Sequence, residues 1–231
     1  MKVTWLGHSG FRIEIEDAVL LVDPWLTGNP LFPAARRAEA IAGATHVLVS
    51  HGHGDHAGDA AALSAELGIP IVCIYELATL WSGCDGVTTL GFGKGGTVEL
   101  GAVAVTLVHA VHSSSIDMTG DGPSLAGTEA GFMIAGEGHT IYFSGDTDVM
   151  ADMAVFADLH APDIGILCIG GHFTMDQQRA AYAATKFFDF KTLIPCHYKT
   201  FPLLAQNADV LKAAVGGLDV REPEILVPIV F

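Results

Sequence analysis

The chain has 231 residues, of which 50% are hydrophobic, and a mean hydropathy of +0.43, which suits a protein with a sizeable buried core. Acidic side chains outnumber basic ones by 26 to 11, so the formal net charge is −15 at pH 7. This balance excludes a general surface for nucleic acid or anionic membranes, because both need a basic face. No apolar run has the length of a membrane-spanning helix and no secretory signal is recognisable, so we expect a cytoplasmic protein.

Strand signals open the chain. Residues 3–6, 11–16 and 18–23 alternate or run together in apolar side chains, with a hairpin turn at Glu16-Asp17, and predict an antiparallel meander. Pro24 and the following glycine and proline then predict a loop, a short helix over 34–42 and a buried strand over 46–50.

Helical and strand-like segments alternate in the rest of the chain. An alanine-rich helix over 58–67 should end at Gly68, and a capping box of Thr174 and Gln177 predicts a helix that continues to about residue 188. Further helices are expected over 76–81, 151–159 and 204–215. Further strands are expected over 69–74, within 83–101, and over 103–111, 130–135, 140–144, 164–169, 192–196 and 225–230. This order implies sheets covered by helices, and no repeat or linker divides the single domain expected over residues 1–231.

The strongest chemical signal is the segment SHGHGDH at residues 50–56, directly after a predicted buried strand. It holds three imidazoles and one carboxylate, which are common metal ligands. The two glycines let the backbone turn sharply, so that neighbouring side chains can converge. We therefore interpret the segment as a metal site rather than a polar surface turn.

Three more candidate ligands stand alone where predicted strands end. They are His112, Asp146 in the sequence SGDT, and His197. Sites on covered sheets usually lie at such strand ends.

This order of motifs resembles the metallo-β-lactamase superfamily: HxHxDH, a single histidine, GDT and a strand-terminal histidine. The flanking segments LGHS (6–9), DP (23–24), HSS (112–114), FTM (173–175) and PCHYKTFP (195–202) are similar to small metal-dependent hydrolases related to ascorbate-6-phosphate lactonase. The resemblance extends over nearly the whole chain. It implies an α/β fold, an αββα four-layer sandwich of two mixed sheets flanked by helices, with a dinuclear metal site at one edge.

The resemblance also implies the ligands and the chemistry. His51, His53 and His112 would hold one divalent ion; Asp55, His56 and His197 would hold a second; and Asp146 would bridge them. Zinc or manganese fits best, with iron or nickel as alternatives. A hydroxide bridging the two ions would cleave an ester-like bond, a lactone or a phosphodiester, in a small soluble substrate. The two ions leave local positive charge despite the two carboxylates, so an anionic substrate is tolerated.

Several residues keep alternative interpretations. We favour His112 over His109 as a ligand, because three residues along a strand place these two side chains on opposite faces. His8 and Asp23 either orient ligands or belong to ordinary turns. Catalytic candidates are Asp55, Asp146 and His172, the last as a proton donor to a leaving group.

Other features carry less information about function. Lys199 either holds an anionic group or is a solvated side chain, and Cys73, Cys84, Cys168 and Cys196 are single cysteines that predict reduced, mostly buried thiols. The Ser113–Ser115 run and the glycines around Lys94 match neither a serine-nucleophile elbow nor a phosphate loop. Alternatives to a hydrolase are an iron-dependent redox protein on the same ligands and a non-enzymatic metal-bound module, and self-association is left open.

Overall fold

The computed structural model describes residues 1–231 and contains two seven-stranded mixed sheets. The first sheet has the order β16-β1-β2-β3-β4-β5-β6. Its strands are β1 Lys2–Gly7, β2 Gly10–Ile15, β3 Ala18–Val22, β4 His46–Val49, β5 Pro70–Ile74, β6 Thr88–Phe92 and β16 Pro228–Val230. The predicted meander is β1 to β3, and its hairpin turn lies at Glu16, which has a positive φ of 52°.

The second sheet has the order β15-β14-β13-β12-β11-β8-β7. Its strands are β7 Thr97–Leu100, β8 Val103–His109, β11 Ala130–Gly136, β12 His139–Phe143, β13 Ile164–Cys168, β14 Thr192–Cys196 and β15 Asp219–Val220. A small separate hairpin pairs β9 (Ser115–Ile116) with β10 (Ser124–Leu125).

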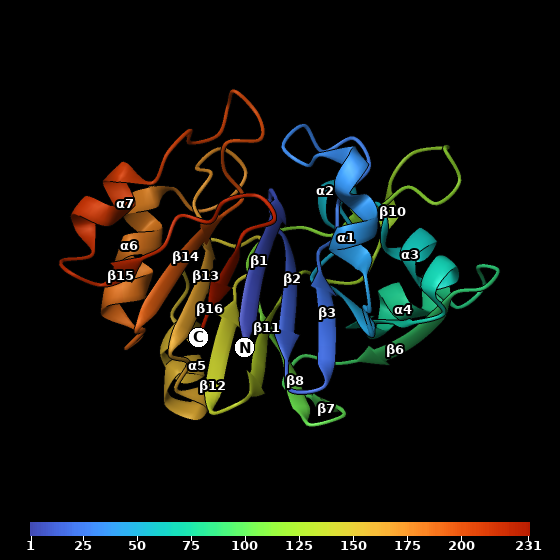
Figure 1. Cartoon of the computed structure of the whole chain (residues 1–231), viewed down its shortest axis with the longest axis horizontal. Helices are drawn as coiled ribbons and strands as arrows, with labels where there is room; N and C mark the ends of the chain where they lie inside the picture. Colours follow the sequence, from blue (N-terminus) through green and yellow to red (C-terminus); the bar gives the residue numbers. More distant parts are fainter.

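The two sheets pack face to face, with helices on both outer sides (Figure 1). Phe11 of β2 and Phe143 of β12 meet edge to face with ring centroids 6.2 Å apart, and one cluster of 63 buried hydrophobic residues draws on both sheets. The helices are η1 Ala34–Arg36, α1 Arg37–Ile41, α2 Gly54–Ala57, α3 Ala60–Leu67, α4 Tyr75–Trp81, α5 Asp152–His160, α6 Gln177–Lys186 and α7 Asp209–Ala214. The αββα sandwich is confirmed.

Two helix predictions need correction. The cap of α6 is Asp176, whose carboxylate accepts from the Arg179 amide at 2.8 Å, and not the predicted Thr174. The helix expected over 204–215 is shorter and begins only at Asp209, as α7. The amides of Leu204 and Ala205 donate instead to the carbonyls of Phe201 and Gly170. These bonds anchor the segment to a neighbouring loop.

Two smaller boundaries also differ. The helix expected over 58–67 begins two residues later, as α3, and the carboxylate of Asp59 just before it accepts from the Leu26 and Thr27 amides at 2.7 and 2.8 Å. The short helix α2, over residues expected to form a loop, precedes it. Gly68 ends α3 with a φ of 67°, as predicted. The last strand begins at Pro228, and residue 225 adds only an isolated bridge to Trp5.

The cysteines agree with the sequence-based expectation of reduced, mostly buried thiols. All four thiols are free, and three of them are buried. Burial raises the pKa of Cys73 to about 12. None of the helices combines the length and the apolar character that crossing a bilayer requires.

Candidate metal centre

Six chain segments bring polar side chains to one edge of the sandwich, the upper edge in Figure 1. The residues follow strands of both sheets: His8, Asp23 and His51 come from the first sheet, and His112, Asp146 and His197 come from the second. The backbone turns abruptly at several of them, since His8, Asp23 and His197 have φ values of 55°, 43° and 54°. Left-handed conformations at non-glycine residues are costly and concentrate at functional sites.

The first group of donors consists of His51, His53 and His112, whose ligand atoms all lie within 4.8 Å of one another. The Nε2 atom of His51 is 3.0 Å from the Nδ1 atom of His53. Burial lowers the pKa of all three imidazoles, and that of His51 falls well below its ordinary value. The group therefore presents uncharged imidazoles, the form that binds metal.

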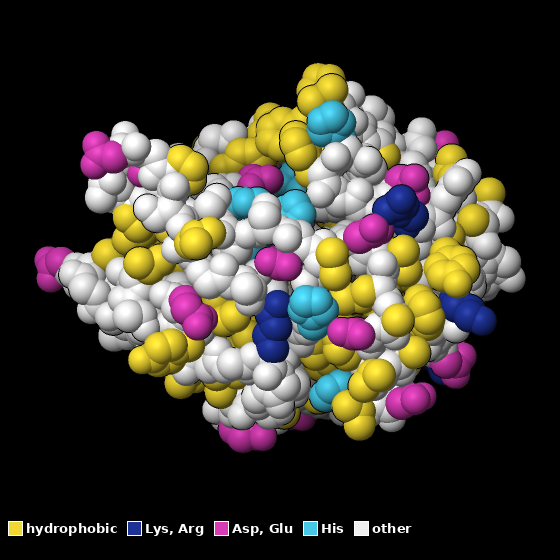
Figure 2. All heavy atoms as spheres, turned by 180° about the vertical axis from the view of Figure 1, so that it is seen from behind, with side chains coloured by type: hydrophobic (Ala, Val, Ile, Leu, Met, Phe, Trp, Pro, Cys, Tyr) yellow, Lys and Arg dark blue, Asp and Glu magenta, His cyan; other side chains and the backbone are white.

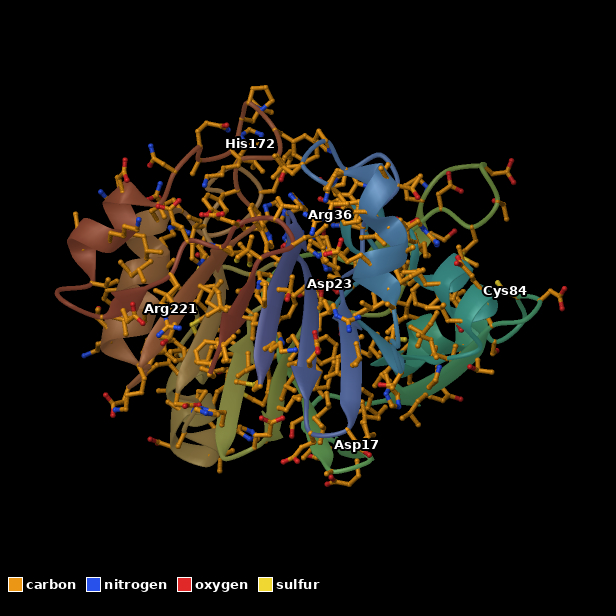
Figure 3. The ribbon with its side chains drawn as sticks, in the orientation of Figure 1. Asp17, Asp23, Arg36, Cys84, His172 and Arg221 are labelled. Atoms are coloured by element: carbon orange, nitrogen blue, oxygen red, sulfur yellow. The ribbon has the colours of Figure 1, made fainter.

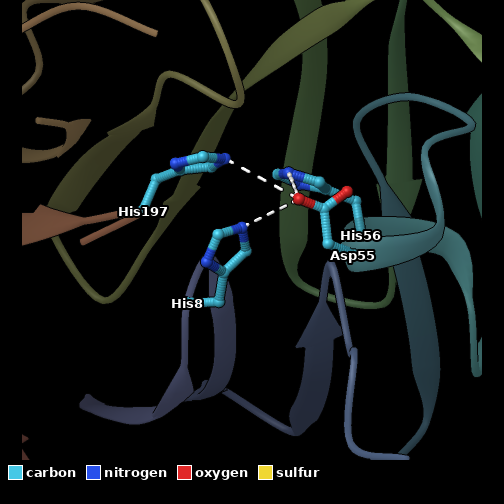
Figure 4. A group of neighbouring side chains, drawn as sticks. All are labelled: His8, Asp55, His56 and His197. Carbon is cyan, nitrogen blue, oxygen red and sulfur yellow. Dashed lines mark hydrogen bonds and ion pairs between the residues drawn. The ribbon is translucent and has the colours of Figure 1, made fainter. Parts of the chain in front are cut away.

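The second group joins His8, Asp55, His56 and His197 within the same 4.8 Å limit (Figure 4). The Oδ2 atom of Asp55 lies 3.0, 4.0 and 3.9 Å from the Nε2 atoms of His8, His56 and His197. All three imidazoles are buried, whereas the Asp55 side chain is 29% exposed and gives the group an opening to solvent.

Asp146 lies between the two groups. Its Oδ2 atom is 3.6 Å from Nε2 of His112 in the first group, and 3.3 and 3.0 Å from Nε2 of His56 and His197 in the second. Burial alone would raise the pKa of the Asp146 carboxyl, but the imidazoles of His197 and His56 outweigh it and hold that pKa well below the usual range. A buried, ionised carboxylate thus faces donors from both groups.

Outer hydrogen bonds determine which ring nitrogen faces inward. The Asp23 carboxylate accepts from Nδ1 of His56 at 2.7 Å, so the neutral form of His56, which is the form that binds metal, has its lone pair on Nε2. The Ser50 hydroxyl donates its proton to Asp23, so Nδ1 of His51, 3.0 Å away, must donate to Ser50. Both imidazoles therefore aim a lone pair at the centre, as metal-binding histidines do.

A hydrogen bond to Thr200 likewise determines which ring nitrogen of His8 carries the proton. The Thr200 hydroxyl donates to the Tyr198 carbonyl at 3.1 Å, so Nδ1 of His8 donates to the hydroxyl at 2.8 Å. Burial lowers the pKa of His8 to about 4, which leaves its Nε2 lone pair facing the Asp55 carboxylate at 3.0 Å.

Several buried polar atoms of the cluster have no hydrogen-bond partner. They are Nε2 of His56, both ring nitrogens of His197 and Oδ1 of Asp146. Unsatisfied buried polar atoms are costly, and a divalent ion among imidazoles and carboxylates would satisfy those that face the centre. The residues present therefore fit a metal centre.

The chain is similar to proteins that are described as metal-dependent. A family model described as a beta-lactamase superfamily domain matches residues 2–197. The chain belongs to the metallo-β-lactamase superfamily. A UPF0173 metal-dependent hydrolase of Dinoroseobacter shibae is 68% identical over 226 residues, covering 98% of both chains. One from Paracoccus denitrificans is 65% identical over 229 residues, covering 99% of both.

A solved structure resembles the chain over its full length. It is Igni18, a metallo hydrolase of the archaeon Ignicoccus hospitalis, which is 31% identical, has a TM-score of 0.86, and is matched over 99% of this chain and 97% of its own. The chain is thus a member of a family of metal-dependent hydrolases within the metallo-β-lactamase superfamily.

Other candidate residues make their contacts outside the two groups of donors. His109 is 3.1 Å from Nζ of Lys94, and Lys199 is 3.1 Å from Glu222. His172 lies on the loop at the upper edge in Figure 3, where its exposed ring packs against Phe173 and makes no hydrogen bond or ion pair with the cluster. Its catalytic role stays a prediction.

The sequence analysis missed three features of the site. It treated His8 only as a partner of ligands, although His8 stands within the second group. It considered Thr200 only as a contact for an anionic group and not as the partner of His8. It did not consider Glu129, whose carboxylate accepts from the His112 amide at 3.0 Å. A lone histidine at the end of the first strand was the available signal for His8; nothing local marks Thr200 or Glu129.

Proposed function

We propose that this chain is a hydrolase that holds two divalent ions and cleaves an ester-like bond, a lactone or a phosphodiester, in a small molecule. His51, His53 and His112 would hold one ion, Asp55, His56 and His197 the other, and Asp146 would contact both. The observation that carries the proposal is the position of Asp146, whose Oδ2 atom faces imidazoles of both groups at 3.0 to 3.6 Å.

Divalent ions bound here would make a nucleophile available from water near neutral pH and would polarise the reacting bond. The chain's own residues supply the frame. Asp23 and Ser50 orient His56 and His51, and the carboxylates of Asp55 and Asp146 offset part of the ionic charge. The positive charge that remains would stabilise the negative charge that develops on the reacting group. It would also tolerate a reacting group that is already anionic.

Zinc or manganese is the proposed metal. Imidazole nitrogen suits zinc, whereas carboxylate oxygen also accepts manganese, and the site combines both donor types. We place the reaction in the cytoplasm, a location to which four single cysteines without a disulfide pattern in the sequence are suited.

The substitution Asp146→Ala tests the proposal. It should reduce cleavage of lactones and phosphodiesters to background and lower the metal content, while the circular dichroism spectrum stays that of the folded chain. The matched control is Asp148→Ala, which removes a nearby carboxylate that pairs with Arg179 at 2.7 Å and makes no contact with the cluster. Full activity in Asp146→Ala would contradict the proposal.

A further inference from the structure

A cavity of about 440 Å³ adjoins the first histidine group. His53 belongs both to that group and to the cavity wall. The volume lies within the range of about 300–1,000 Å³ that is typical of small-molecule sites. The cavity is therefore adjacent to the proposed metal centre, at His53.

The walls of the cavity are largely apolar. Ala57 and Ala61 come from α2 and α3, Trp81 ends α4, and Ile116 and Met118 come from the segment around β9. Gly54 adds no side chain, and a Cβ atom built there would meet nothing within 4 Å. The cavity thus offers an apolar surface to whatever group extends from the metal centre.

No free cation lines this space. The one carboxylate in its wall is Asp117, which also bonds the Gly120 amide at 2.7 Å, and the wall contains no lysine or arginine. In a separate hollow of about 360 Å³, Arg179 donates to both carboxylate oxygens of Asp148. Figure 2 agrees: histidines gather in a hollow of the surface, and the lysine and arginine side chains lie outside it.

We propose that this cavity is the substrate pocket and that it selects an uncharged, apolar group attached to the reacting bond. The inference rests on the proposed function, because the reacting bond itself lies at the metals. A negative charge on the extending group would be partly desolvated beside Trp81, Ile116 and Met118 with no lysine or arginine to pair with it. It would also face the carboxylate of Asp117.

Binding of two matched dyes tests the charge preference without depending on turnover. N-phenyl-1-naphthylamine is uncharged, and 8-anilino-1-naphthalenesulfonate is the same molecule with a sulfonate. With metal-loaded protein, fluorescence titration should show saturable binding of the uncharged dye, at least about tenfold tighter than that of the sulfonate. Equal or tighter binding of the sulfonate would overturn the inference.

Two variants locate the dye. Ala61→Trp should fill the cavity and weaken binding of the uncharged dye about tenfold or more, with unchanged metal content. Ala62→Trp, on the exposed side of the same helix, should leave binding unchanged. If Ala61→Trp does not fold, Met118→Lys serves instead, because Met118 is 41% exposed and an added cation should shift the preference toward the sulfonate. Dye binding that responds to neither cavity variant would place the dye elsewhere and overturn the inference.

Hydrolysis of a second matched pair connects the pocket to the reaction. p-Nitrophenyl butyrate should be cleaved with a higher kcat/KM than p-nitrophenyl hydrogen succinate, whose acyl chain ends in a carboxylate, and Ala61→Trp should remove that difference. Preference for the succinate would overturn the inference. If neither these esters nor the lactones and phosphodiesters are cleaved, the proposed function fails, and the dye preference alone then decides which ligands the cavity accepts.

Discussion

Asp23 is the residue on which the orientation of two ligands depends. It is fully buried, and it accepts hydrogen bonds from Nδ1 of His56 and from both the amide and the hydroxyl of Ser50. Through Ser50 it also determines the tautomer of His51. One carboxylate thereby supports a ligand in each metal group.

Substituting Asp23 by asparagine should therefore weaken metal binding without removing a ligand. An amide cannot accept all three hydrogen bonds, so we expect affinity for metal to fall about 10- to 100-fold. Competition with a chromophoric chelator measures this. Asp163→Asn is the control, because Asp163 accepts from His139 at 2.6 Å at a partly exposed position outside the site. Equal losses in both variants would contradict the role of Asp23.

Local spacing makes some site residues predictable and leaves others hidden. His51, His53, Asp55 and His56 lie within six positions, so their convergence follows from the two glycines between them. His8 meets Asp55 across 47 positions, and only after the sheets have formed. No local sequence pattern indicates this contact between His8 and Asp55. The position of His8 within the second group was missed for that reason.

At the level of elements, helix α6 shows how a cap is chosen. The capping-box pattern of Thr174 and Gln177 predicts Thr174 as the cap. In the structure the Met175 amide donates to the Thr147 carbonyl, so residue 175 is fixed outside the helix, and Asp176 becomes the cap. A tertiary contact determines the boundary.

The substitution Asp176→Ala should lower the free energy of unfolding by about 1 kcal/mol, because the Arg179 amide loses its acceptor. Asp176→Asn, which keeps an acceptor oxygen, should cost only a few tenths of a kcal/mol. Urea denaturation measures both. If Thr174→Ala costs more than Asp176→Ala, the assignment of the cap is wrong.

For the whole molecule, metal binding should release protons. Burial would lower the pKa of His56, but the carboxylates of Asp146, Asp55 and Asp23 outweigh it and raise that pKa well above 6.5 in the metal-free chain. Near pH 7 an incoming ion must therefore displace a proton from His56, and metal affinity falls as the pH falls.

Calorimetric metal titrations in buffers of different ionisation enthalpy count these protons. We expect net proton release at pH 7 that becomes smaller as the pH rises through the pKa of His56. The His56→Ala variant should release fewer protons than the wild type. A heat of binding that is independent of the buffer would contradict the raised pKa.

The architecture of the whole molecule was more predictable than its pocket. Apolar strand patterns and the order of motifs predict the sandwich and the edge that carries the site. The cavity wall combines α2, α3, α4 and the segment around β9, and these meet only in the tertiary structure. Substrate preference could therefore not be predicted from the sequence.

The central claim is that one chain holds two ions joined through Asp146. The most direct measurement is metal content by mass spectrometry, normalised to protein concentration, on chain purified without chelator and then reconstituted. We predict about two equivalents of zinc or manganese per chain in the wild type and a clear loss in Asp146→Ala. One equivalent or less in the reconstituted wild type, or no loss in the variant, would contradict the account.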